Sequence, residues 1–172
     1  RYEAIVVAVG LNEALDLAAT DLDTATSLLT VRHLAGDPVL TEGLATMAAA
    51  QWRKRAKRYL GLMHTSVAAR QDQFGELAFL LEPDLKEGRG GLRDIHALRW
   101  AEAARRILED GDDAALAAAE TVLFDARVEL HRATGRATER LVLQDQDAVA
   151  DALGLTADDL MQELARAART VA

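Results

Sequence analysis

The chain has 172 residues, of which 50% are hydrophobic but only 4% aromatic, and its formal net charge is −8. The length suits one ordinary domain, and the acid excess argues against a general nucleic-acid binder, which is usually basic. The absence of cysteine excludes disulfides and thiolate chemistry and suits a cytoplasmic protein. The apolar stretch from Ala4 to Val9 is far too short to cross a bilayer, so no membrane association is expected.

The N-terminal residues differ from the rest of the chain. Ile5–Val9 are mostly β-branched and end at Gly10, which predicts a short strand or an extended lead-in over residues 1–10. From Leu11 the composition is rich in Ala, Leu, Glu and Arg, which are strong helix formers. We therefore predict an all-α domain over 11–172, a bundle of seven or eight helices with Ala- and Leu-rich seams.

The first helical stretch contains a start signal in its middle. Apolar residues recur three and four apart from Leu11 onward, and Thr20–Asp23 resembles a capping box, so we expect two helices rather than one. Gly36 is expected to end the second helix as a left-handed C-cap. Pro38 then suits the first turn of a third helix.

The middle of the chain alternates helical and glycine-rich segments. Helix is predicted from Pro38 to about Leu80, with a break near Gly61–Thr65. The segment Glu82–Gly91 contains a proline and three glycines and is predicted to be non-helical. A new helix is expected from about Gly91 to about Glu109.

The clearest periodicity follows the turn at Gly111. Leu and Ala alternate three and four residues apart, which predicts a buried helical seam, at Leu116, Ala119, Leu123, Ala126, Leu130, Ala133 and Ala137. Asp145 or Asp147 is expected to open a short helix to Leu153. Thr156 should cap a final helix, whose buried face is predicted to carry Leu160, Leu164, Ala167 and Val171.

The segment most informative about function is EPDLKEGRGGLRDIHALRW, residues 82–100. Three cations, Lys86, Arg89 and Arg93, lie within eight residues, next to glycines that allow close approach of a ligand. A helix beginning near Gly91 would add unpaired N–H groups and the positive end of its dipole. These features predict a phosphate site, although a helix–helix turn with solvated basic residues has the same spacing.

This segment resembles the signature of the PII-protein uridylyltransferase family, roughly EPxxKxGxGGLRDxxxLxW. Three flanking stretches are also similar to the family: residues 21–37, residues 74–83, and residues 130–154, the last in its actinobacterial form. The resemblance covers nearly the whole chain from about Leu11. It is specific in the Glu82–Asp94 motif and unspecific in the Ala-rich helices.

The resemblance implies the helical domain of a larger nucleotidyltransferase that moves UMP from UTP to a tyrosine of the PII nitrogen-signalling protein. Residues 1–10 would then be a remnant of the junction with a preceding catalytic domain, which holds Mg²⁺ with an Asp-x-Asp pair. An HD phosphohydrolase domain and two ACT domains would follow. The expected phosphate-binding residues are Lys86, Gly88, Arg89, Gly90, Gly91, Arg93 and Asp94, the last of which would orient an arginine or cap the helix.

A second basic cluster matches the family but has no assigned role. His131, Arg132 and Arg136 could line the same cleft, or the arginines could pair with acidic neighbours on the surface. The basic run Arg53–Arg58 is most simply a solvated helix face.

Two Asp-x-Asp patterns do not predict a metal site in this chain. Asp21–Asp23 lies in the first turn of a predicted helix, where acidic residues favour the helix dipole, and Asp145–Asp147 also suits a helix start. No His-Asp dipeptide occurs, and the four histidines lack metal-ligand spacing. The sequence therefore predicts no catalytic residue within this chain. Two alternatives remain: a relative that uses ATP as donor, and a non-catalytic helical interaction module.

Overall fold

The computed structural model describes residues 10–172 as an all-helical protein. The strand expected at Ile5–Val9 lies outside the described residues. Within residues 10–172 there are eight α-helices, one short 3-10 helix and no strand, which confirms the predicted fold class. None of these helices combines the length and apolar character that a membrane span requires. The helices are α1 (Leu11–Thr20), α2 (Leu22–Leu29), α3 (Pro38–Lys54), α4 (Ala56–Phe74), η1 (Leu77–Phe79), α5 (Leu92–Ala104), α6 (Asp112–Thr134), α7 (Leu143–Leu153) and α8 (Ala157–Val171).

Residues 11–172, predicted to form one helical domain, divide into two compact units. The first comprises the described residues up to Met63 together with Ala103–Arg106. The second comprises His64–Glu102 and Ile107–Ala172, and it contains the whole glycine-rich signature.

The first unit is built on α1, α2 and α3. The predicted break between the first two helices is present, but its N-cap is Asp21 rather than Thr20, and the Asp21 carboxylate accepts the Thr24 amide at 2.6 Å. In the core, the rings of Trp52 and Tyr59 stack with centroids 4.6 Å apart. The Tyr59 hydroxyl donates to the Ala18 carbonyl at 2.7 Å, so the buried phenol has a partner.

Two boundaries in the first unit differ from the predictions. Gly36 has the expected left-handed conformation (φ +92°), but α2 already ends at Leu29, so Gly36 belongs to the following loop. The break expected near Gly61–Thr65 occurs instead at Arg55, whose guanidinium donates to the Ala19 carbonyl at 3.1 Å. This contact between distant segments favours an interruption that local sequence does not indicate.

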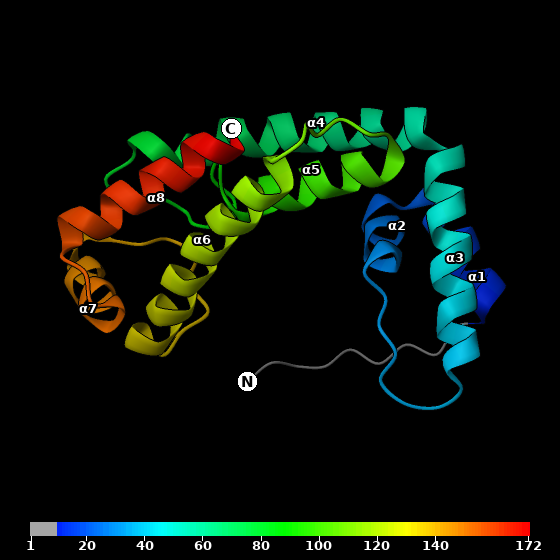
Figure 1. Cartoon of the computed structure of the whole chain (residues 1–172), viewed down its shortest axis with the longest axis horizontal. Coiled ribbons are helices and arrows are strands. Elements are labelled where there is room, and N and C mark those ends of the chain that lie inside the picture. Colours follow the sequence, from blue (N-terminus) through cyan, green and yellow to red (C-terminus); the bar gives the residue numbers. More distant parts are fainter. Residues whose placement is uncertain (1–9) are drawn as a thin grey trace. The chain divides into compact units, whose positions relative to one another are not determined.

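The second unit is organised around α6, α7 and α8, which pack against one another in Figure 1. Five of the predicted seam residues are buried on α6, from Leu116 to Leu130, but Ala137 lies beyond the helix because Gly135 ends it at φ +64°. On α8 the predicted face is confirmed, with Leu160 and Leu164 fully buried. Thr156 caps α8 by accepting the Asp159 amide at 3.1 Å.

The ends of α5 and α7 were placed only approximately by the sequence. Helix α5 ends at Ala104 rather than near Glu109, and the Glu102 carboxylate accepts the amides of Ile107 and Leu108, which stabilises the turn that follows. Helix α7 begins at Leu143, with Asp145 in its first turn rather than at its N-cap.

Candidate functional site

The glycine-rich signature is fixed by backbone pairing on both sides. The Arg89 amide donates to the Gly75 carbonyl at 2.8 Å, and the Leu77 amide returns a bond to the Arg89 carbonyl at 3.0 Å. On the other side, the Leu85 amide donates to the Glu139 carbonyl at 2.9 Å. Segments preceding and following the signature therefore hold it in one conformation, since these pairings use its main-chain groups.

The three glycines of the signature are required by packing within the protein. A Cβ on Gly88 would lie 2.8 Å from the Asp84 carbonyl oxygen, and one on Gly91 would lie 2.9 Å from the carbonyl oxygens of Gly88 and Leu85. Gly90 has φ +83°, and a Cβ there would lie 2.5 Å from the Ala168 carbonyl oxygen on α8. These glycines allow the loop to fold tightly and to contact α8.

The backbone amides expected to hold phosphate are already bonded within the protein. The Gly90 amide donates to the Asp94 carboxylate at 2.8 Å, and the Gly91 amide donates to the Gly88 carbonyl at 2.9 Å. The next two amides, of Leu92 and Arg93, donate to loop carbonyls at 3.1 and 3.0 Å. The first turn of α5 is thus capped by its own loop in this structure, and phosphate binding by the amides of Gly90 and Gly91 stays a prediction.

Asp94 is buried and receives three hydrogen bonds. Besides the Gly90 amide, its donors are the Arg70 guanidinium and the Gln71 side-chain amide, the latter at 3.0 Å. Both side chains come from α4 and lie 24 and 23 residues before Asp94. Asp94 therefore orients an arginine, as the sequence suggested, but that arginine is Arg70, which lies outside the signature. The helical pattern of α4 offered no signal for it.

The three signature cations occupy two places. The Lys86 ammonium and the Arg93 guanidinium both lie 3.4 Å from the Glu87 carboxylate, and each side chain is a third to a half exposed. Arg89 instead pairs with Glu76 at 3.7 Å. Lys86 and Arg93 thus form one cluster around Glu87, and Arg89 is separate from it.

Glu139 connects this cluster to α6. Arg127 donates two hydrogen bonds to its carboxylate, at 2.5 and 2.6 Å, and the Lys86 ammonium lies 3.8 Å away. Burial by itself raises the pKa of Glu139, but the hydrogen bonds and charge of Arg127, with the charges of Lys86 and His131, outweigh burial and hold the pKa below its ordinary value. Glu139 is therefore a stable anion that positions Lys86.

The second predicted cluster is dispersed. The His131 ring Nε2 lies 2.8 Å from the Thr138 carbonyl and 3.8 Å from Glu139. Arg132 is exposed and bonds Glu129, three residues earlier on α6, at 2.5 Å. Arg136 is exposed, in the loop after Gly135. Arg132 thus pairs with an acidic neighbour on the surface, which is one of the two arrangements that the sequence allowed. Of the three residues of this cluster, His131 is the one that lies near Glu139.

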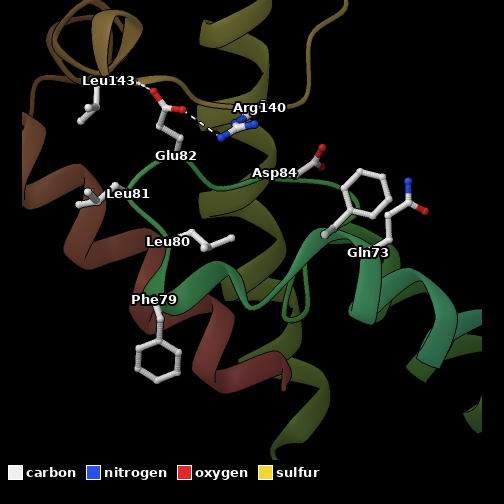
Figure 2. Close-up of a pocket in the computed structure, with 9 residues that line it drawn as sticks. Gln73, Phe79, Leu80, Leu81, Glu82, Asp84, Arg140 and Leu143 are labelled. Atoms are coloured by element: carbon white, nitrogen blue, oxygen red, sulfur yellow. Dashed lines mark hydrogen bonds and ion pairs between the residues drawn. The ribbon is translucent and has the colours of Figure 1, made fainter.

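An open cleft of about 790 Å³ lies at the start of the signature (Figure 2). Its wall includes the exposed apolar side chains of Phe79 and Leu81, which are 73% and 75% exposed. Glu82 contributes a carboxylate that accepts from Arg140 at 3.0 Å and from the Leu143 amide at 3.2 Å, as the dashed lines show. Arg140, rather than His131, Arg132 or Arg136, is the basic residue that lines this cleft.

Neither Asp-x-Asp pattern gathers donors for a metal. Asp21 is an exposed N-cap whose pKa is lowered by its hydrogen bonds with the side chain and amide of Thr24. Among residues 10–172, no group of three or more His, Asp or Glu side chains has a geometry suited to a cation.

The model of the family described as GlnD PII-uridylyltransferase matches residues 50–172, which is more than two thirds of the chain. The chain belongs to the GlnD PII-uridylyltransferase family. The matched region contains all of the second unit's signature contacts, from Arg70 to Glu139.

Curated relatives carry the name bifunctional uridylyltransferase/uridylyl-removing enzyme. The Streptomyces coelicolor protein is 49% identical over 160 residues, which cover 92% of this chain and 19% of that protein. The Mycobacterium tuberculosis protein is 37% identical over 168 residues, which cover 94% of this chain and 21% of that protein. The Pseudomonas fluorescens protein is 28% identical over 166 residues, which cover 90% of this chain and 18% of that protein. The chain therefore spans about a fifth of the length of these relatives. No solved structure matches it.

Proposed function

We propose that this chain is the helical domain of a cytoplasmic bifunctional uridylyltransferase/uridylyl-removing enzyme, acting on a tyrosine of the PII protein with UTP as donor. The observation that carries the proposal is the family match over residues 50–172. Because the described carboxylates form no metal site, Mg²⁺ and the catalytic aspartates would belong to other parts of such an enzyme. The role of this domain is then to position the nucleotide rather than to perform the chemistry.

The residues proposed to act on the nucleotide are Lys86 and Arg93. Both are partly exposed and share one carboxylate, Glu87, which also lies 3.9 Å from Arg70. A phosphate oxygen approaching this pair would gain charge-assisted hydrogen bonds. Arg70 and Glu139 would act indirectly, since Arg70 fixes Asp94 at the helix start and Glu139 positions Lys86.

A chimaera tests this proposal. The region of the Streptomyces coelicolor enzyme that matches this chain is replaced by the chain itself, and transfer of UMP from UTP to PII is measured. The Lys86→Ala and Arg93→Ala chimaeras should each raise the KM for UTP by about tenfold, the loss expected for one charge-assisted hydrogen bond. Arg166→Ala is the control, because Arg166 is exposed on α8 and pairs only locally with Glu163. An unchanged KM and kcat in both test variants would overturn the nucleotide role.

A further inference from the structure

The basic surface formed by Lys86 and Arg93 continues along α5. Arg93, His96 and Arg99 follow one another at intervals of three and therefore lie on one side of the helix. Their side chains are 44%, 46% and 45% exposed. Lys86, in the preceding loop, is 33% exposed. One half-exposed basic face thus extends over about two turns of α5.

Three carboxylates lie beside these four side chains. Glu87 lies 3.4 Å from both Lys86 and Arg93. Glu120, on α6, lies 2.6 Å from Arg99 and 3.9 Å from the His96 ring. Glu139, bonded by Arg127, lies 3.8 Å from Lys86, and Glu87 is shared with Arg70, which also pairs with Asp94. Together with Arg70 and Arg127, the three cations of the face make five permanent positive charges beside four carboxylates, in a chain whose net charge is −8.

His96 lies within this basic face. Burial lowers its pKa, and the charges of Arg93, Arg99 and Lys86 lower it further, whereas Glu120 acts in the opposite direction. The Trp100 ring, with its centroid 5.9 Å away, contacts the imidazole but carries no charge. Burial is thus the main cause of the lowered pKa of His96, and the three cations that would attract an anion add to the lowering.

We propose that Lys86, Arg93, His96 and Arg99 form a single oligophosphate-binding face, which receives the triphosphate of the nucleotide substrate. The proposal rests on the proposed function and adds His96 and Arg99, two phosphate-contacting residues that lie outside the Glu82–Asp94 motif. A bound oligophosphate would offset the repulsion that the three cations exert on the protonated form of His96. Protonation of His96 would then accompany binding and supply a further donor to the phosphate oxygens.

The experiment uses the full 172-residue chain, isotopically labelled, at low ionic strength because salt screens exposed charges. The ring resonances of the four histidines are followed from pH 5 to 8 with and without inorganic tripolyphosphate. His96 should titrate at a higher pH in its presence. The ring resonances of His33, which is exposed in the first unit and hydrogen bonds Thr41 at 3.3 Å, should not respond to tripolyphosphate. Equal responses of both rings, or no response of His96, would overturn the proposal.

Substitution of Arg99 provides the second measurement. Arg99→Gln should weaken tripolyphosphate binding by roughly fivefold or more, as expected for loss of one charge near a partly exposed site, and should reduce the response of His96. Arg166→Gln on α8 is the matched control and should bind as the unaltered chain does. Each variant is first checked for a native amide spectrum. If the folded Arg99→Gln variant binds tripolyphosphate as tightly as the unaltered chain, the proposal is contradicted.

A comparison of ligands separates this inference from the proposed function. UTP and tripolyphosphate should both shift the His96 titration, and uridine should not, because the face recognises phosphate rather than base. If the histidine responds while the chimaera fails to transfer UMP, the anion face stands and the proposed function fails. If the Lys86→Ala chimaera loses activity while His96 shows no response, the proposed function stands and this inference fails.

Discussion

Arg70 on α4 donates a hydrogen bond to the carboxylate of Asp94 in the first turn of α5, and both side chains are largely buried. The same carboxylate accepts the Gly90 amide, so one buried anion connects α4, the glycine-rich loop and α5. Arg70 also donates to the Glu87 carbonyl at 2.6 Å, so it holds the signature against α4 at two points.

Arg70→Met should destabilise the second unit by about 3 kcal/mol, because it leaves a buried carboxylate without its charged partner. Urea unfolding measured by circular dichroism gives the free energy of unfolding. Arg89→Met is the control: Arg89 is half exposed and 3.7 Å from Glu76, so its loss should change the free energy of unfolding by less than about 0.5 kcal/mol. Similar losses in the two variants would show that burial of the Arg70–Asp94 pair is unimportant.

Gly90→Ala should cost about 3 kcal/mol, because the new Cβ would meet the Ala168 carbonyl oxygen at 2.5 Å in addition to the strain of a positive φ. Gly154→Ala separates these two effects. Gly154 has a similar φ of +72°, but a Cβ there has no neighbour within 4 Å, so the cost should be only about 1 kcal/mol. Thermal and urea unfolding of both variants provide the comparison, and equal losses would argue against the close contact with α8.

The Glu139→Gln variant should change how stability depends on pH. The pKa of Glu139 in the folded protein lies below the ordinary value of 4.5. Its ionisation therefore contributes stability that is present above about pH 4.5 and is lost as the pH falls through the lower folded-state pKa. The variant should lose less stability than the wild type below pH 4.5. Parallel curves of unfolding free energy against pH would contradict the predicted link to Arg127 and Lys86.

Glu82→Ala should weaken the start of α7 by about 1 kcal/mol, since its carboxylate accepts the Leu143 amide and the N-cap residue Val142 provides no side-chain acceptor. Hydrogen exchange should accelerate at the first amides of α7. Glu163→Ala removes an exposed ion pair with Arg166 and serves as the control, with an expected change within about 0.5 kcal/mol. Unaltered exchange at Leu143 would show that Glu82 does not cap the helix.

Local patterns in the sequence predicted most helices of the second unit. The alternating Leu and Ala residues of α6 identified its buried face, and Thr156 marked the start of α8. Such signals are reliable because helix periodicity and N-capping depend on residues three or four positions apart. The boundary at Arg55 was missed because its side chain bonds Ala19, 36 residues away.

By itself, the sequence determined the helical class, the glycine-rich signature and the family resemblance, since these depend on composition and on neighbouring residues. Only the tertiary structure decided which groups the signature residues contact. It assigns Gly90 to a contact with Ala168, bonds the amides of Gly90 and Gly91 internally, and places Lys86 and Arg93 together while separating Arg89. The physical reason is that hydrogen bonds and ion pairs depend on distance in space, and the partners of this loop come from α4, α8 and the segment after α6.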